Sequence, residues 1–373
     1  MIPRLLLLLA VLLIAACGES DPPASEEPSQ PAAEAAPSPP PAPPPAAAAG
    51  DATPVRVSLF SWPGYAFWFV AKEKGLAPGL DLQIRIIEDP YESFGLMQGD
   101  QLDAMSSTVE YGPIGAEAGH PARIVSLANT TYGSDKIIVA PGIEKAADLK
   151  GKKVAVLEGG LSQIYMGIFL ERNGLRFDDV TYVNLVSDDA AAAMISGDVA
   201  AGEFWEPYGA QVLANLKGSR IIDQTWDPHW GESGLISDAV FMSKRFIDKD
   251  PELAARTLKA YYDGVAYWME NPKEANEIIA KALQFPLADV VAVIGEEGHF
   301  VKGGLWVYSL GEAAAYFGVA PGEPPLGQKN GGIASLWKLL SDWWLKFGLI
   351  KGEHPIEAGV EKSVLARVVE LSK

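Results

Sequence analysis

Cysteine and histidine are scarce in this chain of 373 residues, which contains one cysteine and four histidines. The single cysteine leaves no spare thiol nucleophile, and the histidines lie far apart without an H-E-x-x-H pattern. A G-x-S-x-G elbow and a phosphate-binding P-loop are also missing. These absences argue against an enzyme, so we predict no catalytic residues, no metal ion and no cofactor.

One nearly pure apolar run, residues 5–16, is shorter than the ~20 residues that a membrane-spanning helix needs. It has the length of the apolar part of a signal peptide and is followed directly by Cys17. The stretch Leu13–Cys17 resembles a bacterial lipobox, in which cleavage leaves an acylated cysteine as the first residue. We predict a lipoprotein signal peptide at residues 1–16 and lipidation of Cys17. The alternative is a plain secretory signal with an incidental cysteine.

Aromatic residues are absent from residues 18–53, which consist largely of Pro, Ala, Glu and Ser. Such a segment buries too little apolar surface to offset the entropy that is lost on ordering. We therefore expect residues 17–53 to be the lipidated cysteine and a disordered linker. The protein would then lie in the periplasm or on another extracytoplasmic face, anchored to a membrane through Cys17.

Basic residues are fewer than acidic ones, with 30 Lys and Arg against 48 Asp and Glu and a formal net charge of −18. Nucleic-acid binding depends on neutralising phosphates with Lys and Arg. This composition therefore argues against a nucleic-acid partner, and we predict none. A negative surface also simply keeps a protein soluble, so the charge identifies no partner.

From residue 54 onward the sequence alternates short apolar strands with amphipathic helices, the pattern of an α/β protein with mostly parallel sheets. Two such series, before and after about Ile138, predict two lobes. In open parallel sheets, ligands bind beyond the carboxyl ends of the strands. The segments that follow the expected strands are residues 62–65, 89–92, 106–111, 129–132, 159–163, 205–208 and 225–232.

These segments hold four of the ten tryptophans and several tyrosines, among them Tyr132. So many rings in exposed loops predict a pocket that they line. The alternative is that the rings cover the core or fill the space between the lobes. The same segments contain carboxylates, including Glu110, Glu206 and Asp227, which would suit an amine or a cationic ring unless they are only solvated surface charges.

The segment Glu158–Gln163 is rich in glycine and precedes an expected helix. Unpaired backbone N–H groups at a helix N-terminus bind anions, so a carboxylate, sulfonate or nitrate group of a ligand fits there. The alternative is that Ser162 caps this helix. The role of His229, which lies in residues 225–232, stays open.

Several segments together resemble the nitrate/sulfonate/taurine-type substrate-binding proteins of ABC importers. Their order and spacing over residues 54–350 carry the resemblance, and no single motif does. The matching segments are Trp62–Tyr65, Lys72–Leu76, Gly112–Pro121, Asp148–Val156, Ser196–Ala201 and Trp205–Pro207.

The resemblance implies a type II periplasmic-binding-protein fold with two lobes joined by a two-strand hinge, whose crossovers would lie near residues 136–140 and 238–242. Lobe 1 would comprise residues 54–138 and 239–373, and lobe 2 residues 139–238. The lobes would close on a small ligand and dock on a permease driven by an ATPase. We expect a monomer that binds a sulfonate, taurine, an amine or a pyrimidine-like solute.

Matching the motifs places Trp62, Tyr65, Ser107, Thr108, Gly160, Ser162, Trp205 and Glu206 at the ligand, and Glu110, Tyr132 and Asp227 are added from the loops. Two alternatives remain. One is a ligand sensor that acts on a signalling partner. The other is an enzyme similar to the fungal pyrimidine synthases, which rely on a cysteine-rich segment that this chain lacks.

Overall fold

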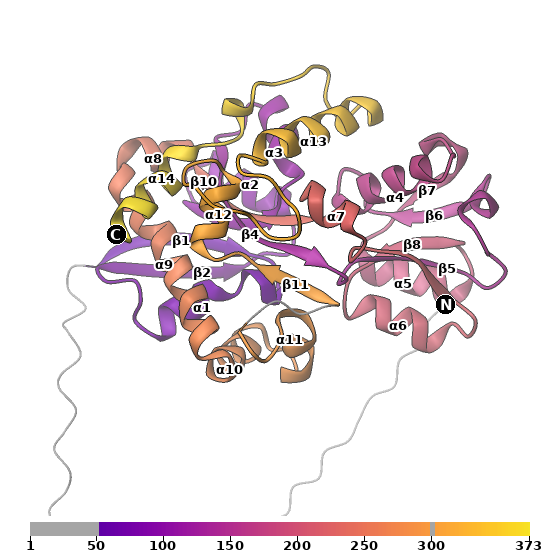
Figure 1. Cartoon of the computed structure of the whole chain (residues 1–373), viewed down its shortest axis with the longest axis horizontal. Coiled ribbons are helices and arrows are strands. Elements are labelled where there is room, and N and C mark those ends of the chain that lie inside the picture. Colours follow the sequence, from indigo (N-terminus) through magenta and orange to yellow (C-terminus); the bar gives the residue numbers. More distant parts are fainter. Residues whose placement is uncertain (1–51, 299–302) are drawn as a thin grey trace, which may run out of the picture. The chain divides into compact units, whose positions relative to one another are not determined.

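The computed structural model describes residues 52–298 and 303–373. The predicted signal peptide, the lipidation site Cys17 and the linker up to residue 51 lie outside the described residues. The described residues contain two β-sheets with helices packed around them (Figure 1). None of the helices in this part of the chain is long and apolar enough to cross a membrane.

The first sheet has six strands in the order β11-β4-β10-β3-β1-β2. Strands β1, β2 and β3 are parallel, whereas β10 runs antiparallel to both β3 and β4. All seven residues of β10 are buried, as expected for a strand in the middle of a covered sheet. The strands are β1 (Thr53–Leu59), β2 (Leu80–Ile86), β3 (Ala104–Thr108), β4 (Ala122–Tyr132), β10 (Ser237–Ser243) and β11 (Gly304–Val307).

The second sheet has five strands in the order β7-β6-β8-β5-β9. Its β6 is parallel to β7 and β8, and β5 runs antiparallel to β8 and β9. The strands are β5 (Lys136–Val139), β6 (Lys153–Val156), β7 (Thr181–Asn184), β8 (Ala201–Phe204) and β9 (Arg220–Gln224).

Helices begin where the sequence provides caps and prolines. In α9 (Pro251–Glu270), Asp250 accepts a hydrogen bond of 2.9 Å from Leu253 N–H, and proline occupies the first helical position. The helices near the first sheet are α1 (Phe67–Glu73), α2 (Pro90–Gln98), α3 (Tyr111–Glu117), α8 (Lys244–Lys249), α9, α10 (Pro272–Leu283), α11 (Leu287–Ile294), α12 (Leu310–Tyr316), α13 (Ile333–Phe347) and α14 (Lys362–Leu371). Those near the second sheet are α4 (Leu161–Arg172), α5 (Ser187–Ser196), α6 (Tyr208–Asn215) and α7 (Pro228–Ser233).

The chain passes between the sheets at residues 133–135 and again at residues 225–236, which include α7. The expected crossovers near residues 136–140 and 238–242 are therefore a few residues too late, because those segments are the strands β5 and β10 themselves. The first crossover begins at Gly133, whose φ of +107° lies in the left-handed region that favours glycine.

The two crossovers are hydrogen-bonded to each other through Thr225, which is fully buried. Its hydroxyl oxygen accepts a hydrogen bond of 2.8 Å from Gly133 N–H and donates one of 3.1 Å to the carbonyl oxygen of Asp135. A second hydroxyl, that of Thr131, lies 2.9 Å away. The passage between the sheets is thus held by few residues and by short-range hydrogen bonds.

A C-terminal helix, α13, supplies another connection. It packs on α3, which belongs to the first-sheet side, and it also contacts α4 beside the second sheet. A Cβ atom at Gly167 of α4 would lie 2.6 Å from the ring of Trp343, and Lys346 forms an ion pair with Glu171. The lobe boundaries stay a prediction, and α13 contacts elements on both sides of them.

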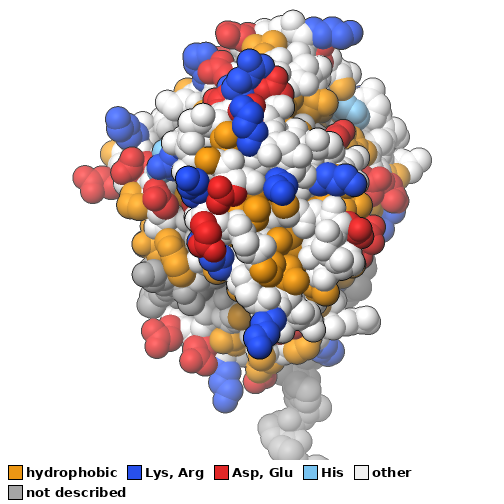
Figure 2. All heavy atoms as spheres, turned by 90° about the vertical axis from the view of Figure 1, so that its right-hand side faces the viewer, with side chains coloured by type: hydrophobic (Ala, Val, Ile, Leu, Met, Phe, Trp, Pro, Cys, Tyr) orange, Lys and Arg blue, Asp and Glu red, His pale blue; other side chains and the backbone are white. Residues whose placement is uncertain are grey.

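The surface near the second sheet has acidic and basic side chains interspersed with hydrophobic ones (Figure 2). Opposite charges therefore alternate over this face, and the negative net charge of the chain is not gathered there into one large acidic area.

Candidate functional site

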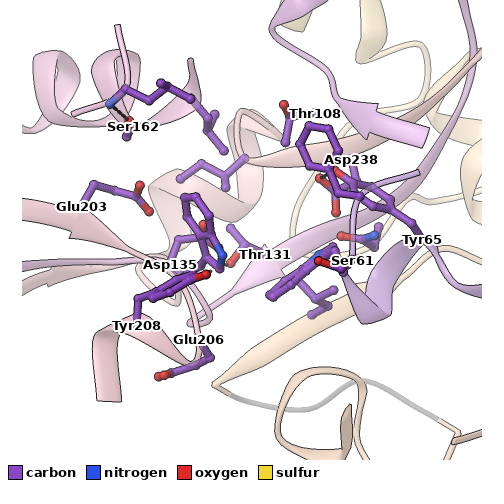
Figure 3. Close-up of a pocket in the computed structure, with 18 of the residues that line it drawn as sticks. Ser61, Tyr65, Thr108, Thr131, Asp135, Ser162, Glu203, Glu206, Tyr208 and Asp238 are labelled. Atoms are coloured by element: carbon purple, nitrogen blue, oxygen red, sulfur yellow. Dashed lines mark hydrogen bonds between the residues drawn. The ribbon is translucent and has the colours of Figure 1, made fainter. Parts of the chain in front are cut away.

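A cavity of about 200 Å³ lies between the two sheets and is lined by residues of both (Figure 3). The carboxyl ends of several parallel strands contribute to it, as expected for this class of fold. The lining residues are Phe60, Ser61, Trp62, Tyr65, Glu88, Thr108, Glu110, Tyr111, Asn129, Thr131, Asp135, Leu157, Leu161, Ser162, Glu203, Trp205, Glu206, Pro207, Tyr208, Ile236, Asp238, Phe285 and Leu305.

Three lining residues form a row across the first sheet. Asp238 of β10 pairs with Thr108 of β3 on one side and with Asn129 of β4 on the other. Paired residues of neighbouring strands point to the same face of a sheet. The row therefore presents a hydroxyl, a carboxyl and an amide side chain to the cavity.

The loop after β1 closes over this row. Residues Pro63–Tyr65 form a short 3-10 helix with proline in its first turn, and the hydroxyl of Tyr65 donates a hydrogen bond of 2.7 Å to Asp238 Oδ1. Asn129 donates one of 3.1 Å to the carbonyl oxygen of Gly64. A Cβ atom at Gly64 would lie 2.5 Å from Asn129 Nδ2, so only glycine allows this approach.

Asp238 is 7% exposed, and burial raises its pKa to about 7. The hydrogen bond from Tyr65 and the nearby donors of Asn129 and Trp62 lower the pKa of this carboxyl, but by less than burial raises it. At neutral pH the Asp238 carboxyl is therefore divided between its protonated and ionised forms.

Glu110, which follows β3, is 1% exposed. The hydroxyl of Thr108 donates a hydrogen bond of 2.6 Å to its Oε1, whereas its Oε2 has no hydrogen-bond partner among the described residues. Burial raises the pKa of Glu110 to about 8. The backbone carbonyl of the same residue accepts a hydrogen bond of 2.8 Å from Trp344 in α13, which fixes its position.

The second sheet contributes another pair of carboxyls. Asp135, just before β5, is 7% exposed, and Glu203 of β8 is 4% exposed. Burial raises the pKa of Asp135 to about 6, and it also raises the pKa of Glu203, with the neighbouring charge of Asp135 adding to the shift. Figure 3 shows this pair on the opposite side of the cavity from Tyr65 and Asp238.

The cation nearest to this pair already has a partner. Lys136 is 3% exposed and forms an ion pair with Glu206, whose other oxygen accepts a hydrogen bond of 3.1 Å from Ala210 N–H at the start of α6. Glu206 is joined to Pro207 by a cis peptide bond. Lys136 therefore lowers the pKa of Asp135 and Glu203 only in part.

The glycine-rich segment before α4 uses most of its backbone donors internally. Leu157 N–H donates to Ser162 Oγ at 2.8 Å, Glu158 N–H to Asn184 Oδ1 at 3.0 Å and Gly159 N–H to Gln163 Oε1 at 2.9 Å. The alternative that Ser162 caps α4 is wrong, because Gly160 is the N-cap residue and the Ser162 hydroxyl bonds backward to Leu157.

Aromatic rings form much of the remaining wall. The ring of Phe60 meets Tyr65 edge to face at a centroid distance of 6.1 Å, and Trp205 meets Tyr208 in the same way at 5.8 Å. These pairs come from different sheets and from strand ends far apart in the sequence. The cavity thus combines flat apolar surfaces with carboxyl groups.

Seven of the eleven residues expected to bind ligand line this cavity: Trp62, Tyr65, Thr108, Glu110, Ser162, Trp205 and Glu206. Four do not. Ser107 points to the face of β3 opposite that of Thr108, and Gly160 is the N-cap of α4. Tyr132 lies at the end of β4, and Asp227 caps α7 by accepting a hydrogen bond of 3.0 Å from His229 N–H. His229 is likewise absent from the lining.

Sequence reasoning missed three buried carboxyls of the lining, Asp135, Glu203 and Asp238. The sequence did contain an indication that two of these carboxyls, Glu203 and Asp238, are buried at a site. Glu203 and Asp238 each stand inside a short apolar strand, where a carboxylate is rarely placed without a partner. Among the described residues, no group of three or more His, Cys, Asp or Glu is arranged to hold a metal ion.

A family model described as NMT1/THI5 like matches residues 62–275. The chain belongs to this family. Among its relatives, a binding protein of Brucella abortus is 26% identical over 247 residues, which cover 64% of this chain and 75% of the relative. The taurine-binding periplasmic protein of Escherichia coli is 27% identical over 152 residues, covering 41% of this chain and 46% of the relative.

Solved structures of several binding proteins share the fold of this NMT1/THI5 like chain. The periplasmic aliphatic sulphonate binding protein of Escherichia coli aligns with a TM-score of 0.63 at 19% identity, covering 83% of this chain and 92% of that one. The periplasmic nitrate-binding protein of Synechocystis aligns with a TM-score of 0.62 at 14% identity, covering 86% and 89%. These matches confirm the predicted α/β fold of the periplasmic-binding-protein type.

One structural neighbour is an enzyme. A desulfurization enzyme aligns with a TM-score of 0.54 at 15% identity, covering 86% of this chain and all of that one. The fold therefore serves both binding proteins and enzymes, and the function of this chain rests on its own site.

Proposed function

We propose that this chain is the solute-binding component of an ABC importer, which captures a small organic solute in the cavity between the two sheets. The observation that carries the proposal is the cavity itself. It is lined from both sheets, and two of its lining residues, Asp135 and Ile236, belong to the two crossovers by which the described chain passes between the sheets. Family membership and relatives that are binding proteins for sulfonates and taurine support the same function.

Ligand capture follows from this arrangement. A solute that contacts both walls of the cavity stabilises the conformation in which the sheets lie close together. A change in the angle between the sheets would bend the two crossovers and would also shift α13, which contacts α4 beside the second sheet. The closed form then docks on a membrane permease that an ATPase drives. The protein acts as a monomer and performs no chemistry on the solute.

The enzyme alternative finds little support in the cavity. The lining residues include hydroxyls and carboxyls but neither cysteine nor histidine, and the pyrimidine synthases that resemble this family rely on a cysteine-rich segment. A sensor that passes its closed form to a signalling partner remains the second candidate. Both functions use the same closed form, so neighbouring genes for a permease and an ATPase distinguish them.

The predicted anchor places the protein on the extracytoplasmic side of a membrane, tethered through Cys17 and the linker. Relatives that are periplasmic binding proteins support this location. Substitution Cys17→Ser should release the protein from the membrane fraction into the soluble fraction. Continued membrane association of the variant would contradict lipidation.

The solute-binding function is tested with the full chain, purified in detergent, against a panel of small organic solutes of all charge types. A bound solute should raise the melting temperature and change the tryptophan fluorescence, and small-angle scattering should show a more compact protein. Substitutions Trp62→Ala and Trp205→Ala should abolish these changes, whereas Glu277→Gln on the exposed side of α10 should not. Normal binding by both tryptophan variants would show that the cavity is not the ligand site.

A further inference from the structure

We propose that the solute is a small organic cation whose positive group lies between Glu110 of the first sheet and the Asp135–Glu203 pair of the second, with its apolar body against the aromatic walls. This inference rests on the proposed solute-binding function and specifies the chemistry of its ligand. It separates this chain from the relatives named for sulfonates and nitrate.

The charges of the cavity wall point to a cation. Six lining residues are acidic: Glu88, Glu110, Asp135, Glu203, Glu206 and Asp238. None of the described residues that line the cavity is Lys or Arg. Lys136 lies beside it, but its ammonium group is paired with Glu206. An anionic solute would find no Lys or Arg among these lining residues to offset its charge, whereas a bound cation would favour the ionised forms of the buried carboxyls.

Two of these carboxyls have an oxygen without a partner. Glu110 Oε2 and Glu203 Oε1 are buried and make no hydrogen bond within the described residues. A buried acceptor without a donor destabilises the folded protein, so such oxygens call for a group that the protein itself does not supply. Glu110 and Glu203 belong to different sheets, and a donor bound between them would join the two walls.

The backbone N–H groups of the glycine-rich segment before α4 are largely engaged within the protein. Three backbone N–H groups before α4 donate to the side chains of Ser162, Gln163 and Asn184. The backbone N–H of Leu161, the first residue of α4, lies close enough to the carboxyl of Glu110 to lower its pKa. A carboxyl of the protein thus lies beside the position that a sulfonate or nitrate would take.

The aromatic side chains that line the cavity predict the apolar part of the ligand. Trp62 and Phe60 extend from the loop after β1, and Trp205 and Tyr208 extend from the segment after β8. Aromatic faces attract cations and also stack on flat apolar groups. A cavity of about 200 Å³ holds a single ring or a short alkyl chain with its amine, but not a long polymer.

The test compares solutes that share a skeleton and differ only in charge. Calorimetric titration and thermal shift with the full chain use benzylamine, benzyl alcohol and phenylmethanesulfonate, and in parallel propylamine, propanol and propanesulfonate. In at least one series the amine should bind at least tenfold more tightly than the alcohol, and the sulfonate should not bind measurably.

The outcomes separate this inference from the proposed function. Binding of a sulfonate or an alcohol as tight as that of the amine would overturn the cation inference and leave solute binding intact. If no amine binds, the inference is wrong; if no member of the wider solute panel binds either, the proposed function is wrong as well.

Charge-removing variants identify the carboxyls that hold the amine. Glu110→Gln and Glu203→Gln keep the side-chain size, and each should weaken amine binding at least tenfold without weakening alcohol binding. Glu277→Gln, on the exposed surface of α10, is the matched control and should bind as the unchanged chain does. Melting temperatures of the free variants establish that they fold. Unaltered amine affinity in both folded variants would overturn the inference.

Discussion

The hydroxyl group of Tyr65 donates a hydrogen bond of 2.7 Å to Asp238, a residue 173 positions later in the sequence. The contact joins the loop after β1 to the strand by which the chain returns from the second sheet. It also brings an aromatic ring and a buried carboxyl to the same wall of the cavity. This hydrogen bond therefore fixes the loop after β1 to a buried carboxyl group of the cavity.

Substitution Tyr65→Phe should destabilise the protein by about 1–3 kcal/mol, because Asp238 would lose a donor while it stays buried. Chemical denaturation of the free protein measures the change. Tyr165→Phe is the matched control. Tyr165 is equally buried, but its hydroxyl has no hydrogen-bond partner among the described residues, so removing it should change stability little. Equal losses in the two variants would show that the Tyr65 hydroxyl contributes no specific bond.

The buried carboxyls predict how stability depends on pH. Burial raises the pKa of Asp135 to about 6, that of Asp238 to about 7 and that of Glu110 to about 8, whereas carboxyls of an unfolded chain titrate near 4. Between these values the folded state binds more protons than the unfolded state. This additional proton binding stabilises the folded protein fully below pH ~4, and the stabilisation is lost as pH rises through 6–8.

We therefore expect the melting temperature of the ligand-free protein to fall between pH 5 and pH 8.5, measured at constant ionic strength. The double variant Glu110→Gln/Glu203→Gln should show a shallower fall, since it removes two of the groups responsible. A bound amine should oppose the fall, because a cation favours the ionised carboxyls. A melting temperature that rises over this range would contradict the assignment.

The sequence was sufficient for the α/β class of the fold, but the expectation of mostly parallel sheets is wrong, because β4, β10 and β11 form antiparallel pairs in the first sheet and β5 pairs antiparallel with β8 and β9 in the second. Asp250 and Pro251 identify the start of α9, and the alternation of strands and helices identifies two sheets of an α/β protein. The segments that follow the expected strands also predicted Trp62 and Trp205 as ligand-binding residues, and both line the cavity.

The chemistry of the site could not be obtained in the same way. Whether Glu110 is solvated or buried depends on α13, which follows more than 200 residues later and donates a hydrogen bond to it from Trp344. The glycine-rich segment before α4 has the composition of an anion site, yet three of its backbone N–H groups donate to the side chains of Ser162, Gln163 and Asn184. Such partners are fixed by tertiary packing and not by local pattern.

Substitution Gly64→Ala should damage the cavity wall. The added methyl group would lie 2.5 Å from Asn129 Nδ2 and 2.7 Å from Leu305 Cδ1, so both side chains must shift. We expect a destabilisation of about 1–3 kcal/mol and a loss of ligand affinity of about tenfold or more. Gly95→Ala in α2 is the control. Its Cβ atom meets nothing within 4 Å, and alanine there should be neutral or stabilising by up to about 1 kcal/mol. Equal affinities in the two variants would contradict the role given to Gly64.

Substitution Thr225→Val should weaken the connection between the crossovers. Valine keeps the shape of threonine but removes the hydroxyl that accepts from Gly133 N–H and donates to the carbonyl oxygen of Asp135. Because these backbone groups are buried, we expect a destabilisation of about 1–3 kcal/mol. Backbone amide exchange should become faster at Gly133, while amides in the middle of β10 stay protected. Thr181→Val, at an exposed position of β7, is the control and should change neither quantity. If exchange at Gly133 stays slow in Thr225→Val, the hydroxyl does not hold the crossovers together, and other bonds, such as those from Thr225 N–H to the Asp135 carbonyl and from Gln224 Nε2 to the Gly133 carbonyl, are sufficient.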